Sequence, residues 1–198
     1  MNNPDLSKVI LTDCDGVLLN WDHGFHAWMK MKGHKLIKGT EWSYDIGPRY
    51  GIDAVETKRL CKEFNTHARI GFLPPLRDAV KHVRKLHDEE GYVFHVITAQ
   101  TLDPFAQKLR IRNLEEVFGK GIFERYVFTD CGADKTEVLK EYEDTGLLWI
   151  EDKFENAEIG RQLGLSAVLM DHPYNMGPAE GIKRYPNWRE IYNDWRTY

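Results

Sequence analysis

The stretch KVILTDCDGVLLNW, residues 8–21, places two carboxylates one residue apart, directly after a short apolar run. The run Val9–Thr12 shows no polar alternation, which predicts a strand that is buried on both faces. Side chains two apart on a strand face the same side, so Asp13 and Asp15 are expected to converge on one point. Two like charges at one point are unfavourable unless a cation or a shared proton compensates them. Gly16 then permits a tight turn directly after the pair.

A single aspartate after a strand is usually explained as a turn residue or a helix cap. The pairing of Asp13 with Asp15 argues against that explanation, because two convergent carboxylates need a counter-ion. Mg²⁺ is the natural one, since it prefers carboxylate and phosphate oxygens and keeps several waters. Cys14 lies between the two and should point to the opposite face, so we expect a small buried apolar residue there rather than a nucleophile.

The 198 residues have the composition of an ordinary globular protein, with 42% hydrophobic and 29% charged residues. A formal net charge of −4 gives no reason to expect a nucleic-acid polymer as a partner. No apolar stretch approaches the roughly 18–20 residues that span a bilayer, and the start MNNPDLSK lacks the features of a signal peptide. Three widely spaced cysteines, Cys14, Cys61 and Cys131, fit a reducing compartment. We therefore expect a cytoplasmic protein without a membrane partner.

Short apolar runs alternate with helical patterns along most of the chain, which predicts an α/β fold with a parallel sheet. The expected strands are Val9–Thr12, Tyr92–Ile97, Tyr126–Phe128, Leu147–Ile150 and Ala167–Met170. The expected helices cover residues 76–86, a segment capped by Thr101, residues 135–142, a segment from Asn156 to Gly164, and the aromatic C-terminal segment 187–195. In such sheets, ligands bind beyond the carboxyl ends of the strands.

About fifty residues after the first strand contain no convincing second strand. Trp21–Lys32 has a helical pattern, and Asp53 with Glu56 forms a capping-box pattern for a second helix. The positions of that helix expected to face inward are Val55, Leu60 and Phe64. The segment is rich in aromatic residues, most of which are expected to pack its own small core. We therefore expect a small helical cap over residues 20–71, inserted into a core formed by residues 1–19 and 72–198.

Polar side chains follow the carboxyl ends of the later predicted strands. Thr98 ends the second strand, Lys135 begins a helix shortly after the third, and Glu151-Asp152 follow the fourth. Because parallel strand ends meet at one edge of a sheet, we expect a hydroxyl, an ammonium and a second acidic pair to join the first pair. The segment DHPYN, residues 171–175, follows the last strand and is expected to form a loop near the site, without assigned chemistry.

This order of motifs resembles the haloacid dehalogenase superfamily, with DCDGV, Thr98, Lys135 and Glu151-Asp152 as the four motifs. The resemblance implies an α/β fold with a Rossmann-like core, a central parallel sheet and a small helical cap inserted after the first strand. It implies that Asp13 is a nucleophile forming an aspartyl-phosphate, and that Asp15 protonates the leaving oxygen and then activates water. The residues expected to bind the phosphoryl group are Thr98, Ala99 and Lys135. Those expected to hold Mg²⁺ are Asp13, the Asp15 backbone carbonyl and Asp152, backed by Glu151.

Sequence outside these motifs is similar to the small 5′(3′)-deoxyribonucleotidases. The similarity is carried by WDHGFHAWM after DCDGVLLN, and by GFLPPLRDAVKHVRKL, VFTDCGADKTEVL and LLWIEDKFENA. It implies a phosphatase for a nucleoside or deoxynucleoside monophosphate whose base stacks on Trp21. The chain departs from that family in reading TAQ at the second motif, where TS is usual, and in starting the fourth motif with Glu151 instead of Asp.

Three other functions share parts of the pattern. A phosphatase for another small ester, such as a sugar phosphate, would keep every catalytic residue and differ only in the cap. A signalling receiver domain also uses an acidic pair, a phosphorylated Asp, a Thr and a Lys, but is shorter and has no cap insertion. A catalytically dead binding module would lack a functional group at some motif position, and none is missing here. The pattern leaves the oligomeric state open, a homodimer included.

Overall fold

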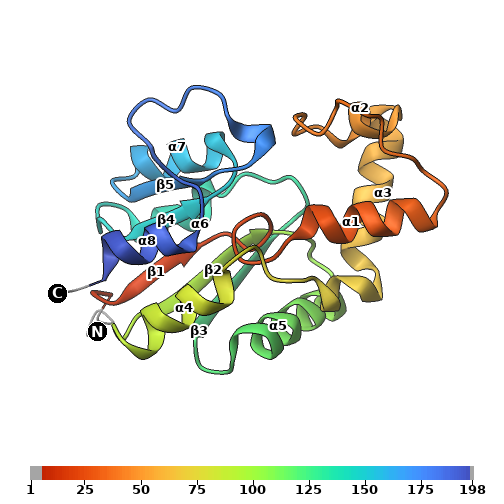
Figure 1. Cartoon of the computed structure of the whole chain (residues 1–198). Helices are drawn as coiled ribbons and strands as arrows, with labels where there is room; N and C mark the ends of the chain where they lie inside the picture. Colours follow the sequence, from red (N-terminus) through yellow and green to blue (C-terminus); the bar gives the residue numbers. More distant parts are fainter. Residues whose placement is uncertain (1–5, 197–198) are drawn as a thin grey trace.

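The computed structural model describes residues 6–196, and in that part a six-stranded sheet is covered by helices (Figure 1). The strands run in the order β3-β2-β1-β4-β5-β6, and each neighbouring pair is parallel. The strands are β1 (Val9–Thr12), β2 (Val93–Ala99), β3 (Phe123–Thr129), β4 (Leu148–Glu151), β5 (Ser166–Met170) and β6 (Lys183–Tyr185). The expected fold class is confirmed. Residues 1–5 and 197–198, which belong to the predicted core, lie outside the described residues.

The register of the sheet brings three strand ends together. Thr12, the last residue of β1, pairs with Val96 of β2 and with Ile150 of β4. The backbone N–H of Asp13 donates to the Ile150 carbonyl at 2.9 Å, so pairing continues one residue past β1. Residues that follow β1, β2 and β4 therefore gather at one carboxyl edge of the sheet.

Two hydrophobic clusters cover the two faces of the sheet, and β1 contributes to both. Ile10 packs in a cluster with α4 (Ala79–Asp88), α5 (Pro104–Phe118) and α8 (Trp188–Trp195). Leu11 packs in a second cluster with α6 (Thr136–Leu139), η2 (Lys140–Tyr142) and α7 (Phe154–Gln162). Successive strand residues face opposite sides, and both are fully buried here. This explains why the β1 sequence is uniformly apolar.

A helical segment lies to one side of the sheet, at the end towards which the strands point (Figure 1). It comprises α1 (Trp21–Met31), α2 (Ile46–Tyr50), α3 (Ala54–Thr66) and η1 (Ala68–Phe72). The rings of Phe25, Trp28 and Phe64 pack at 5.3–5.8 Å between centroids. These three residues belong to the same hydrophobic cluster as Ile10 of β1, so the segment and the sheet share one continuous core.

Two expectations for α3 need correction. The Asp53 side chain accepts the Glu56 N–H at 2.8 Å, but the Glu56 carboxylate binds Arg59 instead of returning to the cap, so only half of the capping box forms. Leu60 and Phe64 are buried as expected, whereas Val55 is 82% exposed. A spacing of five residues turns a helix by about 140° beyond a full revolution, which rotates Val55 away from the buried side.

The start of α5 and the last strand also differ from expectation. The N-cap of α5 is Asp103, whose side chain accepts the Ala106 N–H at 2.8 Å, and not Thr101. Pro104 at the first helical position requires the cap directly before it, and Thr101 instead accepts the Asp103 N–H. Strand β6 was not predicted, because its three residues include Lys183 and Arg184 and carry no strand pattern.

The other predicted helices are present, with ends that differ by up to three residues, whereas the short helix α2 was not predicted. Helix α8 buries Trp188, Ile191 and Tyr192 against the body, and Trp195 packs partly on it. Within residues 6–196, no helix combines the length and the apolar character that a membrane span needs. The cytoplasmic location and the homodimer stay predictions.

Candidate active site

Asp13 lies buried at the carboxyl end of β1, with an ammonium group beside it. The Lys135 Nζ atom is 2.9 Å from Asp13 Oδ1 and 2.6 Å from Glu151 Oε1. The Cys14 backbone N–H also donates to Asp13 Oδ1, at 2.7 Å. Lys135 is only 1% exposed, so its charge acts inside the site. Both contacts engage Oδ1, and among the described residues no donor reaches Oδ2, which keeps its lone pairs for an incoming group.

Asp13, Glu151 and Asp152 form an acidic cluster in which one oxygen of each carboxylate lies within 4.8 Å of the others. Burial raises the pKa of Asp13 to about 7, with Lys135 opposing and the neighbouring carboxylates adding to the rise. Burial and the same carboxylates also raise the pKa of Asp152 well above its usual value. If all three carboxylates are ionised, the cluster therefore holds more negative charge than the Lys135 ammonium neutralises. Carboxylate oxygens in this number fit Mg²⁺, a hard cation that would make up the deficit.

Glu151 differs from the other two members of the cluster because protein donors occupy both of its oxygens. Oε1 accepts from Lys135 Nζ and, at 2.8 Å, from Asn156 Nδ2. Oε2 accepts the backbone N–H groups of Asp152 and Lys153 at 2.8 and 2.9 Å. Burial opposes ionisation of Glu151, but Lys135 and these hydrogen bonds lower its pKa. This geometry favours Asp13 and Asp152 as direct metal ligands, with Glu151 orienting the groups around them.

Asp15 lies outside the acidic cluster and is held by an arginine. Its two carboxylate oxygens accept from the two terminal nitrogens of Arg110, with 3.1 Å between Oδ2 and Nη2. Arg110 comes from α5 and is fully buried. Burial raises the pKa of Asp15, and the guanidinium opposes that rise. Asp13 and Asp15 line the same cavity, as expected, although both lie past the end of β1 at Thr12 and Asp15 is not a member of the acidic cluster.

Cys14 is fully buried, as expected, but its surroundings are not purely apolar. The Arg110 Nη1 atom lies 3.3 Å from its sulfur. Burial raises the pKa of the Cys14 thiol, which disfavours the thiolate form that a nucleophile needs.

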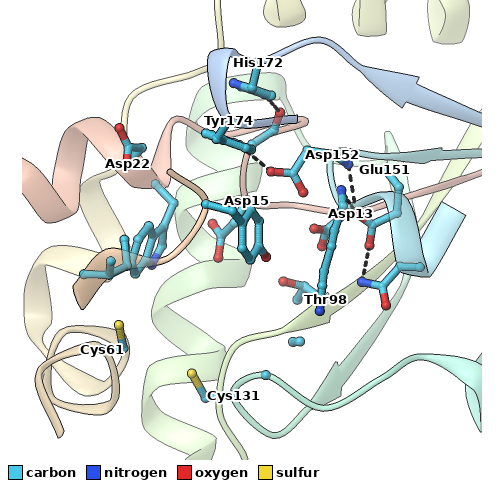
Figure 2. A pocket seen from close by; sticks show the side chains of 18 of the residues that line it. Asp13, Asp15, Asp22, Cys61, Thr98, Cys131, Glu151, Asp152, His172 and Tyr174 are labelled. Atoms are coloured by element: carbon cyan, nitrogen blue, oxygen red, sulfur yellow. Dashed lines mark hydrogen bonds between the residues drawn. The ribbon is translucent and has the colours of Figure 1, made fainter. Parts of the chain in front are cut away.

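A cavity of about 290 Å³ opens at the carboxyl edge, between the sheet and the helical segment. In Figure 2, the side chains of Asp13, Asp15, Thr98 and Asp152 surround a common space. The predicted site residues that line this cavity are Asp13, Asp15, Trp21, Thr98, Ala99, Lys135, Glu151 and Asp152. The structure therefore brings the whole predicted set together, while the roles of its members stay predictions.

Trp21 lines the cavity and also packs in the helical segment. Its ring stacks on Phe25 with 4.6 Å between centroids and meets Phe64 edge-on at 5.5 Å. Its Nε1–H donates to Asn65 Oδ1 at 2.8 Å. Phe25 covers one face of the indole, so a ligand has only the rest of the ring available.

Comparison with curated proteins finds one distant relative, and no family model matches the chain. The relative is an uncharacterized 32.4 kDa protein from the Gp30-rIII intergenic region of Enterobacteria phage T4. It is 25% identical over 141 residues, which cover 69% of this chain. The chain spans 50% of the length of that relative.

Solved structures match nearly the whole chain. The haloacid dehalogenase-like family protein SP0104 from Streptococcus pneumoniae has a TM-score of 0.66 at 12% identity, covering 96% of this chain and 98% of its own. YfnB from Bacillus subtilis, bound to magnesium, has a TM-score of 0.61 at 11% identity, with 94% and 97% covered. CbbY from Rhodobacter sphaeroides, in complex with phosphate, has a TM-score of 0.58 at 14% identity, with 93% and 96% covered. The chain has the haloacid dehalogenase-like fold.

Within this haloacid dehalogenase-like fold, sequence reasoning missed the groups that support the predicted residues. The position of Arg110 could have been recognised from the sequence. Arg110 lies four residues after Ala106 and four before Leu114, so the helical spacing places a charged residue on the buried face of α5. The position of Tyr174 could also have been recognised, because the segment after the last predicted strand has to start at the carboxyl edge. Tyr174 Oη donates to Asp152 Oδ2 at 2.5 Å, so the loop left without assigned chemistry contacts the acidic cluster.

Replacing Arg110 with methionine is expected to destabilise the folded protein by about 3 kcal/mol, because it leaves the largely buried Asp15 carboxylate without its partner. Urea unfolding measures this change. The matched control is Arg112→Met on the same helix, where the side chain is 49% exposed and pairs with Glu116. The control is expected to change stability by no more than about 0.5 kcal/mol. Equal losses in the two variants would contradict a special contribution from the Arg110–Asp15 pair.

Proposed function

We propose that the protein is a magnesium-dependent phosphatase that hydrolyses a small phosphate monoester through an aspartyl-phosphate on Asp13. The observation that carries the proposal is the placement of Asp13, Lys135 and the acidic cluster in one cavity at the carboxyl edge. Phosphoryl transfer needs positioning and charge neutralisation more than elaborate bond-making, and these groups are suited to both. In this proposal, residues 20–71 act as the cap and residues 1–19 and 72–198 as the catalytic core.

The proposed reaction has two steps. In the first, a carboxylate oxygen of Asp13 attacks phosphorus, the bond to the leaving oxygen breaks, and Asp15 donates a proton to that oxygen. In the second, Asp15 takes a proton from water as the water attacks the aspartyl-phosphate, which releases inorganic phosphate and restores Asp13. Because Arg110 engages both Asp15 oxygens, the carboxyl has to turn away from the guanidinium to reach the leaving oxygen.

The phosphoryl group is proposed to lie against Lys135, Thr98 and Ala99. Thr98 is 1% exposed and Lys135 is buried beside Asp13, so both offer donors that water does not compete for. Asp13, the Asp15 backbone carbonyl and Asp152 would hold Mg²⁺, which supplies positive charge against the phosphoryl oxygens. Without that charge, the acidic cluster would repel a dianionic ester.

The leaving group is proposed to be a nucleoside or deoxynucleoside. The cap side of the cavity supports this by combining an aromatic ring, Trp21, with polar groups such as Asn65 and Asp22 that suit a base and a sugar. A sugar phosphate is the second candidate. It is favoured by the stacking of Phe25 on Trp21, since an indole used for packing leaves less surface for a base.

A substrate panel tests the proposal. Phosphate release is measured from ribo- and deoxyribonucleoside monophosphates, 5′ and 3′, and from sugar phosphates, each with Mg²⁺ present. Faster turnover of nucleoside monophosphates supports the nucleotidase assignment, and faster turnover of sugar phosphates supports the second candidate. If none of these esters nor p-nitrophenyl phosphate is hydrolysed, the phosphatase proposal is wrong.

Trp21→Ala is expected to lower kcat/KM for nucleoside monophosphates by about one to two powers of ten, while p-nitrophenyl phosphate turnover stays nearly unchanged. A stacked base gains roughly 1–3 kcal/mol from an aromatic face, and a small generic ester gains little of this. Both efficiencies and the melting temperature are measured on the one variant. A parallel loss in both substrates, together with a lower melting temperature, would identify Trp21 as a packing residue.

A further inference from the structure

The segment Asp171–Asn175, which follows β5, contacts both loops that carry proposed metal ligands (Figure 2). Tyr174 Oη donates to Asp152 Oδ2 at 2.5 Å, and His172 Nε2 donates to the Gly16 carbonyl at 2.6 Å. The two rings stack with 4.7 Å between centroids and 3° between planes. One stacked pair of side chains therefore joins the loop after β4 to the turn after β1.

The same segment is anchored at its far end. Asn175 Nδ2 donates to the backbone carbonyls of Asp152 at 2.7 Å and Met170 at 2.8 Å. Arg184 of β6 in turn donates through Nη2 to Asn175 Oδ1 at 2.9 Å. Tyr174 is thus presented from a loop that the Asn175 side chain ties to the loop after β4 and to the end of β5.

The contact between Tyr174 and Asp152 is packed against the turn after β1. A methyl group at Gly16 would collide with Asp152 Oδ2 and would lie 2.9 Å from Tyr174 Oη, and Gly16 has a φ of +78°. Only glycine satisfies both the close approach and the backbone conformation. Oδ2 is therefore enclosed by Gly16 and Tyr174. Among the described residues, no hydrogen-bond donor contacts Oδ1.

We propose that Tyr174 is a positioning residue of the metal site, holding Asp152 Oδ2 so that Oδ1 is the oxygen that binds the cation. This inference rests on the proposed magnesium site. A ligand held by a hydrogen bond from behind loses less freedom when a metal binds, and such partners typically contribute 10- to 100-fold in metal affinity. His172, stacked on Tyr174 and bonded to Gly16, keeps the phenol ring at the required angle.

Tyr174→Phe removes only the donor oxygen and is expected to raise the dissociation constant for Mg²⁺ at least about tenfold. Isothermal titration of the full chain with Mg²⁺, without substrate, measures this, and Mn²⁺ binding followed by electron paramagnetic resonance checks it independently. Tyr185→Phe is the matched control. It removes another tyrosine–carboxylate hydrogen bond, from Tyr185 Oη to Asp194 at 2.7 Å, and is expected to leave the dissociation constant unchanged.

The outcomes separate this inference from the proposed function. If the wild-type chain binds neither cation, the proposed metal site and the proposed role of Tyr174 are both wrong. If the wild-type chain binds the cations and Tyr174→Phe binds them equally well, only the proposed positioning role of Tyr174 is wrong. If Tyr174→Phe does not fold, His172→Phe takes its place, because it keeps a stacked ring but loses the bond to Gly16. That variant is expected to weaken binding by a smaller factor, and unchanged affinity would overturn the inference.

Discussion

Asp13→Asn is expected to lower kcat by about four orders of magnitude or more while the protein keeps its fold. The amide preserves the size of the side chain but removes the anionic oxygen that would attack phosphorus, and loss of a nucleophile typically has an effect of this order. Phosphate release with the best substrate of the panel gives kcat. Circular dichroism and the melting temperature report the fold, which should survive because the substitution removes one charge from the crowded acidic cluster.

The matched control for this variant is Asp130→Asn. Asp130 is an exposed aspartate that also follows the carboxyl end of a strand, β3, but it is not among the residues that line the cavity. The turnover of the Asp130→Asn variant is expected to equal that of the wild-type protein. Near wild-type turnover in Asp13→Asn would rule out the covalent route, and a phosphorylated peptide containing Asp13, trapped by acid quench, would support it directly.

Removal of divalent cations with excess chelator is expected to abolish turnover, and added Mg²⁺ is expected to restore it. Asp13, Glu151 and Asp152 gather negative charge at the place where a dianionic phosphate has to bind. Among residues 6–196, Lys135 is the cationic side chain that forms ion pairs with this cluster, and it is already shared between Asp13 and Glu151. Full activity in chelator would contradict the metal requirement.

Melting temperatures test the same metal site without substrate. In the metal-free protein, burial raises the pKa of Asp13 from 3.8 to about 7, so the folded state holds a proton that the unfolded chain releases. The stability that this group contributes is present below about pH 4 and is lost as the pH rises through about 7. Mg²⁺ binds the deprotonated carboxylates and is therefore expected to raise the melting temperature more at pH 8 than at pH 5. Equal shifts at the two pH values would contradict this.

The sheet and its carboxyl edge could be predicted because the residues of β1 indicate directly that the strand is buried. A run that is buried on both faces has to be apolar throughout, and the polar residues after it have to lie at the edge. Thr98 and the pair Glu151-Asp152 follow the same rule. Their positions along the chain, directly after predicted strands, were therefore enough to predict that they lie at this edge.

The supporting groups depend on distances that sequence spacing does not encode. Arg110 meets Asp15 across 95 positions of the chain, and Tyr174 meets Asp152 through a loop with no repeating pattern. Val55 shows a related limit, since an apolar residue near a helix start says little about which way the helix is rotated. Such contacts are decided by how elements pack, after the local structure has formed.

The continuous core shared by the sheet and the helical segment is expected to restrict the size of molecule that enters the cavity. Phe25, Trp28 and Phe64 belong to the same buried cluster as Ile10, so moving the helical segment away from the sheet as a rigid body would open part of that cluster to water. Water-exposed apolar surface costs about 25 cal/mol per Å², which makes a wide opening expensive. A folded protein carrying a phosphorylated side chain is larger than a free phosphate ester and is expected to need a wider opening to bring its phosphate to Asp13. If the protein is the proposed phosphatase, we therefore expect it to hydrolyse small phosphate esters faster than phosphoproteins.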